Sequence, residues 1–283
     1  GTVKGLSEGT SVITIKGKVS TNVSATCTVT VKKEMKRLSA ADIAANKETY
    51  YGEVAQNYTQ GGLTYRIFYV DTKGNFGDGV NTIYLKADYK AEESLSIDIS
   101  KLTDADITKY KNMNPLWAAK RESIAPASWN DNEKAAAWLC APSQWTAYAD
   151  SSIEGSYAIG GPSAEMYVAS YNDVAHNNGT AKDKLSTEYR ATRYPGYIYK
   201  VNGELNNSGW STASNSIDNT GYSSMYVKSE TWWWLASPSS NDSYNVCSVN
   251  GGNASLSNDY YNNMYGVGPL VSLPSDFTVE VEQ

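Results

Sequence analysis

Polar and apolar residues alternate along the first 32 residues of the chain. In Ser24–Val31 every even position carries a hydroxyl group and every odd position is apolar, and Ser11–Ile15 is a neighbouring run rich in β-branched residues. A period of two residues is typical of a strand with one buried face, so we expect two strands around a turn. Two strands cannot bury a core alone. We therefore expect them to pack on the rest of the chain or on sequence upstream, with Cys27 as a buried small hydrophobe.

The pattern changes after Lys33 to short helices and strands. Ser39 and Asp42 form a capping-box sequence that opens a short helix to about Lys47, and Ser163 is placed to cap another helix. Further segments are expected to be helical at 104–113, 132–139 and 163–172, and extended at 65–71, 81–87, 197–201, 231–236, 244–249, 267–273 and 277–281. Strands followed by helices and then by strands predict an α+β domain.

Two pairings and one connection follow from this order. We expect the strands at 65–71 and 81–87 to pair, and the strand at 277–281 to pair with the N-terminal strands. The connection Asp71–Asp78 is rich in Gly and Asp. Its oxygen-bearing residues miss the regular spacing of a calcium loop and no Glu closes it, so a long hairpin connection is the better interpretation.

Tryptophans mark the expected core. In Trp232-Trp233-Trp234, strand alternation places Trp232 and Trp234 on one face and Trp233 on the other. We expect at least two of the three in the core, with a place at the rim of a site left open for one. Four further tryptophans are expected in the core rather than on a sugar-stacking platform: Trp117, Trp129, Trp138 and Trp145.

Composition and charge narrow the chemistry. The 283 residues include 22 Tyr, 22 Gly and 8 Trp but a single His, His176, and three Cys. A metal site with several imidazoles is therefore excluded, and a catalytic base that must be a His would have to be His176, in a polar stretch. The net charge is −6, and no basic residue follows Lys228, which disfavours nucleic acids and anionic membranes as partners. No apolar run approaches the roughly 18 residues of a membrane span.

The segment 239–265 has the composition of a recognition loop. Asn, Ser, Asp and Tyr account for 19 of its 27 residues, and it contains no Lys, Arg, Glu or Gln. Tyr offers large, stiff contact area, and Ser and Asn offer adaptable hydrogen bonds, as in antibody paratopes. The alternative is a polar, turn-rich surface loop without a binding role. Apolar residues interrupt this polar run and its continuation, at Val246, Val249, Leu256, Val267 and Leu270, and favour strands over disorder.

Three blocks of the chain together resemble one family. They are Tyr51-Gly52 with Thr64–Asp71, then Ala158–Asn172, then Trp234–Pro238 with the polar run that ends at Gly266–Leu270. In this order they resemble the C-type-lectin-like domains related in fold to formylglycine-generating enzymes. Such domains occur among gut bacterial and phage surface proteins and as variable proteins of diversity-generating retroelements. The resemblance implies a C-type-lectin-like fold, a mixed and mostly antiparallel sheet with flanking helices, over about residues 36–275.

A second resemblance concerns the N-terminal segment. Gly5–Thr10, the strand after it and Cys27–Val31 resemble the C-terminal half of a bacterial Ig-like domain of the second type. The expected division is a partial Ig-like β segment at 1–32, a C-type-lectin-like domain at 33–275 with its variable segment at 239–265, and a C-terminal strand at 276–283. One position departs from the first family, which commonly ends in Gly-Val-Arg-Pro. Here position 268 is Gly, so whatever that Arg anchors must be anchored otherwise.

The resemblance to retroelement variable proteins implies where a ligand binds. Template adenines are randomised in that family, and AAC codons altered in their first two letters encode Asn, Tyr, Ser and Asp but never Lys, Glu, Gln, Met or Trp, which leaves Met264 as a fixed position. The resemblance also implies an extracellular location, on a bacterial cell surface or a phage virion. It implies a protein or glycan ligand on another cell or virion surface. The ligand-facing positions expected on this logic are Asn241, Asp242, Ser243, Tyr244, Ser248, Asn250, Asn253, Ser255, Ser257, Asn258, Asp259, Tyr260, Tyr261, Asn262, Asn263 and Tyr265.

Other functions remain open at this point. A fixed-specificity carbohydrate-binding lectin or adhesin could use calcium held by Asp242 or Asp259 with neighbouring Asn residues, although no spaced motif is present. An enzyme of the formylglycine-generating type would, by resemblance, need two closely placed cysteines, and Cys247 has no neighbour in sequence while Cys140 is far along the chain. A purely structural surface protein is the fourth alternative. We expect a non-enzymatic recognition protein without a cofactor, with its oligomeric state open.

Overall fold

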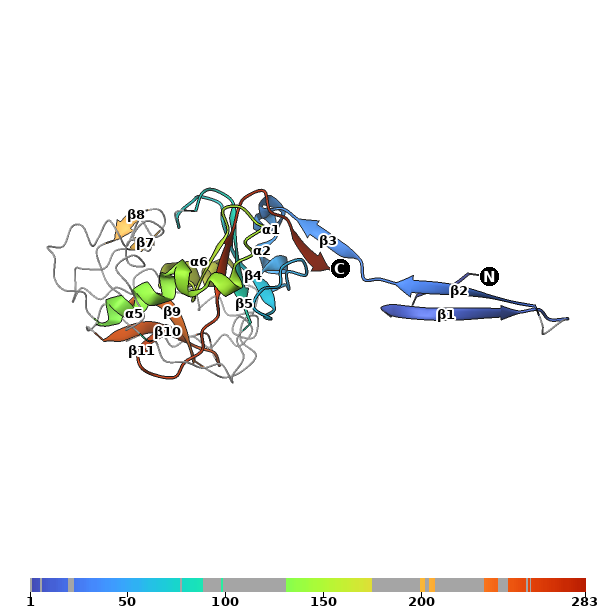
Figure 1. Ribbon diagram of the computed structural model, residues 1–283. Helices are drawn as coiled ribbons and strands as arrows, with labels where there is room; N and C mark the ends of the chain where they lie inside the picture. The colour runs from blue at the N-terminus through green and yellow to red at the C-terminus, as the bar shows by residue number, and fades with distance from the viewer. Residues whose placement is uncertain are drawn as a thin grey trace.

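A computed structural model gives the structure of the chain. It describes residues 2–5, 7–19, 23–76, 78–88, 98, 131–174, 199–201, 204–206, 232–238, 244–252, 254 and 256–283. The helix expected at 104–113 lies outside these residues, as do Trp117, Trp129 and His176. The described elements form a mixed α+β architecture whose paired strands are antiparallel (Figure 1). The α+β prediction is thereby confirmed.

A four-stranded antiparallel sheet forms the centre of the molecule. Its strand order is β4-β5-β12-β6, with bounds Tyr65–Asp71, Thr82–Ala87, Leu270–Leu273 and Tyr157–Ile159 respectively. Every residue of β5 and β12 is buried. The expected pairing of β4 with β5 is confirmed, and β12 brings the C-terminal part of the chain against β5.

Helices pack on this sheet and begin where their capping residues predict. The Ser39–Asp42 capping box is formed in both directions, and the Ser163 hydroxyl accepts a hydrogen bond from the Met166 amide at 3.2 Å. The α-helices are α1 (Ala40–Ala45), α2 (Lys47–Tyr50), α5 (Asp131–Cys140) and α6 (Ala164–Val174), with two short 3-10 helices at Pro142–Gln144 and Thr146–Tyr148. Within the described part of the chain, none of the helices has the length and apolar character to cross a membrane.

A three-stranded antiparallel sheet carries most of the polar C-terminal segment. Its order is β11-β10-β9, with bounds Leu256–Tyr260, Asn245–Asn250 and Trp232–Pro238. The strands β9 and β10 were expected, whereas β11 was not. Helix α5 packs against β9 and β10. A separate short pair is formed by β7 (Tyr199–Val201) and β8 (Glu204–Asn206).

The C-terminal strand pairs differently from the prediction. The strand β13 (Val279–Glu282) is antiparallel to β3 (Met35–Leu38) rather than to the N-terminal strands. Burial accounts for this choice, because Leu38, Val279 and Val281 are all buried in the core of the domain. The side chains of Arg37 and Glu280 add an ion pair at 2.8 Å across the two strands.

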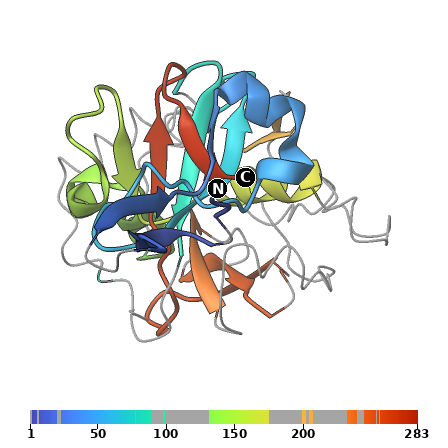
Figure 2. The same cartoon turned by 90° about the vertical axis from the view of Figure 1, so that its right-hand side faces the viewer.

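The N-terminal strands form a hairpin that extends away from the domain. The strands β1 (Gly9–Lys16) and β2 (Ser24–Val31) pair in register, and Figure 1 shows them projecting beyond β3. Of the two expected alternatives, packing on the rest of the chain is not seen among the described residues, and packing on sequence upstream stays a prediction. Cys27 is exposed rather than buried, and Ile15 is 64% exposed, because no described element covers the apolar face. Figure 2 shows that the two chain ends lie on the same side as this hairpin.

Candidate ligand-binding surface

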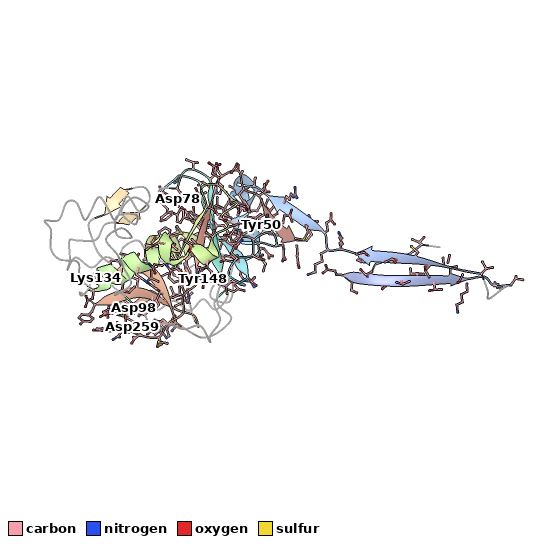
Figure 3. All side chains as sticks on the ribbon, in the orientation of Figure 1. Tyr50, Asp78, Asp98, Lys134, Tyr148 and Asp259 are labelled. Atoms are coloured by element: carbon pink, nitrogen blue, oxygen red, sulfur yellow. The ribbon has the colours of Figure 1, made fainter. Side chains whose placement is uncertain are left out.

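The predicted ligand-facing residues are distributed over β10, β11 and the turn that follows β11. Five of the sixteen lie outside the described residues: Asn241, Asp242, Ser243, Asn253 and Ser255. The other eleven are placed, and they divide into an exposed group, a supporting group and one fully buried residue. Figure 3 shows Asp259, which lies within this region, at the end of the domain away from the hairpin.

An exposed row of tyrosines forms the first group. The Tyr244 side chain is 47% exposed and Tyr260 is 39% exposed. The rings of Tyr244 and Tyr260 lie 5.4 Å apart, and those of Tyr260 and Tyr261 are stacked at 5.0 Å. The neighbouring Asn262 is exposed, and Met264 is 62% exposed. We call Tyr244, Tyr260, Tyr261, Asn262 and Met264 the tyrosine surface. Sequence reasoning treated Met264 only as a fixed position, because a lone methionine in a polar run gives no signal of exposure.

A hydrogen-bond network below the tyrosine surface fixes the 259–265 turn. The Asp259 carboxylate accepts hydrogen bonds from the Asn263 amide at 2.7 Å and from the Tyr265 hydroxyl. Asp259 Oδ1 also accepts the backbone N–H of Tyr260 at 3.2 Å. Burial, followed by the Asp259 contact, raises the pKa of the Tyr265 hydroxyl. Asp259, Asn263 and Tyr265 therefore serve the turn internally, and their side chains support the surface rather than form it.

The tryptophans of β9 hold the same turn from beneath. The Tyr265 ring stacks on Trp232 at 5.7 Å and lies 4.6 Å from Trp234, whereas Trp233 packs on Tyr167 of α6. The predicted alternation, with Trp232 and Trp234 on one face and Trp233 on the other, is confirmed. Trp233 and Trp234 are buried and Trp232 is half-buried, so two of the three are in the core, as expected. Trp138 and Trp145 are also buried as predicted.

Ser248 is the one described member of the predicted set that cannot contact a ligand in this structure. It is fully buried in the central strand β10, directly opposite Trp234. Its hydroxyl has no hydrogen-bond partner among the described residues. The prediction is corrected here because Ser248 is buried beside Trp234, against which the ring of Tyr265 packs at 4.6 Å, and composition alone did not reveal this packing.

The remaining polar residues of the set stabilise the sheet locally. Asn250 accepts the amide N–H of Gly252 at 2.8 Å and so closes the turn between β10 and β11. The side chain of Asn258, which is half-buried, accepts a 3.4 Å hydrogen bond from Asn245 across the strands. Ser257, opposite Ser248, is half-buried. All three residues are half-buried, and Asn250 lies at the end of β10 opposite to Tyr244.

The acidic connection between β4 and β5 is a hairpin, as interpreted from the sequence. The Asp71 carboxylate accepts the backbone N–H groups of Lys73 and Phe76, at 3.2 and 2.8 Å. Asp78 accepts hydroxyl hydrogen bonds from Tyr84, Tyr157 and Ser272. Burial raises the pKa of Asp78, and these hydroxyl groups oppose that shift. Both carboxylates are thus engaged inside the fold.

Carboxylates and cysteines are the remaining side chains that could support metal binding or thiol chemistry. Among the described residues, no group of three or more His, Cys, Asp or Glu side chains is arranged to hold a metal ion. Asp242, one of the two expected calcium ligands, lies outside those residues, and Asp259 is used by the turn. Cys140 and Cys247 are buried and form no disulfide, and their thiols lie 3.6 and 3.7 Å from the carbonyl oxygens of Ala236 and Pro238.

The departure at position 268 has a steric explanation. A Cβ atom on Gly268 would lie 2.5 Å from Nζ of Lys86 and 3.0 Å from its Cε. The side chain of Lys86, a buried residue of β5, therefore occupies the space next to this glycine, and no larger residue fits there without displacing it. The final strand β12 nevertheless begins directly afterwards, at Leu270.

Comparison with known proteins gives one match. Residues 142–275 match the model of a family described as a domain of unknown function, DUF6273. This range includes helix α6, the three-stranded sheet and the whole tyrosine surface. Comparisons with curated proteins and with solved structures each found no match. Since the matched family carries no described activity, the function must be argued from the surface itself.

Proposed function

We propose that this chain is a non-enzymatic recognition protein that binds a protein or glycan ligand through the tyrosine surface. One observation carries the proposal: Tyr260 and Tyr261 lie on a turn that is fixed from below by Asp259, Tyr265 and the β9 tryptophans, and the exposed ring of Tyr244 packs beside Tyr260. Exposed aromatic rings supply large contact area, and their prior ordering reduces the entropy lost on binding. The surface therefore combines the two properties that a binding site needs.

The scaffold that we propose is a C-type-lectin-like domain in which the 239–265 segment is the variable region of a retroelement target protein. The antiparallel central sheet with its helices supports this fold, and the polar alphabet of the segment supports diversification. Such a protein would act outside the cell, on a bacterial surface or a phage virion. Variation at exposed positions would change the ligand, while the buried support would keep the fold.

Sequencing the codons for residues 229–275 across a population of the source organism tests diversification without a known ligand. We expect substitutions at exposed positions such as Tyr244, Tyr260 and Asn262. We expect Trp234 and Ser248 to stay constant, because substitution of either changes buried packing. An invariant segment would reject diversification and would favour a fixed-specificity lectin or adhesin.

Binding is tested on the whole chain with arrays of glycans and of purified bacterial surface proteins, with and without calcium. A Tyr244→Ala/Tyr260→Ala variant is expected to lose at least about tenfold in affinity, because interface tyrosines are frequent hot spots. The matched control is Tyr50→Ala, on α2, which Figure 3 places toward the hairpin, far from Asp259. Equal binding by both variants would place the ligand elsewhere.

A further inference from the structure

A buried lysine lies at the junction between the two main sheets. Lys86, in β5, has no exposed surface, and its Nζ lies 4.4 Å from the centre of the Trp233 ring in β9. Within the described part of the chain its hydrogen bonding consists of a single contact, 3.3 Å to the carbonyl oxygen of Ala87. An ammonium group has three donors, so this site satisfies the charge poorly.

Among the described residues, no carboxylate forms a direct ion pair with Lys86. The nearest influential carboxylate is Asp88, which is bound instead to the Arg66 guanidinium at 2.7 Å. Burial lowers the pKa of Lys86 to about 8, and Asp88 offsets part of that shift. An apolar side chain of similar length would avoid this cost of desolvation. Fold stability therefore does not explain why a lysine occupies this position.

The position of the ammonium group suggests another reason. It lies against Gly268, and the preceding Gly266 is hydrogen-bonded to β9 through the amide of Trp234 and the carbonyl of Trp232, at 2.9 and 2.8 Å. Strand β5, strand β9 and the 266–268 segment thus meet at Lys86. Because Tyr265 stacks on Trp232 and Trp234 directly before this segment, the junction fixes the turn that carries the tyrosine surface.

We infer that Lys86 is a positioning residue for the tyrosine surface, whose ammonium group holds β9 and residues 266–268 in one arrangement on β5 at a cost in stability. Buried polar and charged groups act in this way in other folds, where they select one packing over its alternatives. The inference rests on the proposed function only in calling the tyrosine surface a ligand-binding surface. The arrangement itself can be measured without a ligand.

The first test replaces the lysine in the whole chain by Lys86→Met, with Lys134→Met on the exposed face of α5 as the control. We expect the melting temperature of the variant at pH 7 to exceed that of the parent chain by about 2 °C or more. We also expect amide hydrogen exchange in β9–β11 to accelerate about tenfold, with β4 and β5 unchanged. A lower melting temperature with uniform acceleration, or unchanged exchange in β9–β11, would overturn the inference.

The pH dependence tests whether the charge of Lys86 is buried at the junction, which the inference requires. The folded pKa of about 8 lies below the ordinary value of 10.5, so the unfolded chain holds this proton more tightly. The free energy of unfolding of the parent chain, relative to that of Lys86→Met, is therefore lowest below pH 8. It rises as the pH increases from 8 toward 10.5. Among the described residues, Asp88, Arg66 and Tyr167 are ionisable groups near this junction. Carbon-13 labelling of the lysine ε carbons should show a midpoint near 8 that Lys86→Met removes, and an ordinary midpoint would contradict burial of the charge.

The second variant, Gly268→Ala, keeps the charge and moves it. The added Cβ must displace Nζ, so we expect the same local acceleration of exchange in β9–β11 as in Lys86→Met. The double variant Lys86→Ala/Gly268→Ala makes room for the methyl group and is expected to exchange no faster than Lys86→Ala alone. Exchange at the parental rate in Gly268→Ala would overturn the positioning role. Failure of the proposed function would appear instead as an invariant segment or absent binding, with these rates unaffected.

Discussion

In the β1–β2 hairpin Ile15 and Cys27 are exposed, whereas in the three-stranded sheet Val246 and even Ser248 are fully buried. Both regions consist of short antiparallel strands with many hydroxyl-bearing residues. Polar and apolar residues alternate more regularly in the hairpin than in β10, yet the residues of β10 are the buried ones. The difference comes from what lies across each face: α5 and the Tyr265 turn cover the three-stranded sheet, and no described element covers the hairpin. Local pattern determines the strand, and the remainder of the chain determines its burial.

Cysteine reactivity should show the largest difference between the two regions. Cys27 in β2 is exposed, and Cys140 and Cys247 are buried. We expect a thiol reagent to modify one cysteine quickly in the native chain and all three in denaturant. The two buried thiols should react about 10³-fold or more slowly, because they require opening of the domain. Fast modification of Cys247 would show that the sheet opens far more easily than its burial indicates.

Truncation of a large apolar side chain should lower the stability of the fold in the three-stranded sheet but not in the hairpin. Trp234→Ala removes a fully buried side chain that supports Tyr265 and should cost about 3–5 kcal/mol in the free energy of unfolding. Ile15→Ala in the hairpin should change it by less than about 0.5 kcal/mol. Urea unfolding of the whole chain measures both. A large effect of Ile15→Ala would reveal a partner for the hairpin.

Loss of the carboxylate that holds the turn should have a smaller effect. Asp259→Asn weakens the hydrogen bonds to Tyr265 and Asn263 and should cost about 1 kcal/mol. The matched control is Asp276→Asn, which changes an exposed aspartate of the C-terminal segment. Equal stability of the two variants, measured by urea unfolding, would mean that Asp259 does not support the surface.

Removal of the buried Ser248 hydroxyl should have an effect of similar size and of the opposite sign. Ser248→Ala deletes a buried polar atom that has no partner among the described residues, so it should raise stability by about 1 kcal/mol. Ser24→Ala in the hairpin deletes an exposed hydroxyl and should be neutral. Destabilisation by Ser248→Ala would indicate a hydrogen bond to a residue outside the described ranges.

The features that could be predicted were those determined by neighbouring residues. The capping box at Ser39, the pairing of β4 with β5 and the alternation of the β9 tryptophans depend on short-range geometry, and the structure confirms them. The features that could not be predicted depend on distant contacts. The pairing of β13 with β3 joins residues far apart in sequence, and Ser248 is buried where Trp234 of the neighbouring strand packs against Tyr265 of a later turn.

The candidate site shows the same limit. Composition located the segment, and Tyr244, Tyr260 and Asn262 are exposed as a recognition surface requires. Composition did not separate these residues from Asp259 and Tyr265, because the same side chains that bind a ligand well also bind each other well. Only the structure distinguishes residues that form the surface from residues that support it.

The pairing of β3 with β13 has a mechanical consequence. Strand β3 continues directly from the hairpin, and its four residues pair in register with β13 (Figure 1). A tether that pulls on the hairpin, against a ligand held at the far end of the domain, would load these hydrogen bonds together along the strand direction. Bonds loaded together in shear break less readily than bonds opened one by one. The domain would thus transmit tension through its core while the turn that carries the tyrosines bears force only at the ligand.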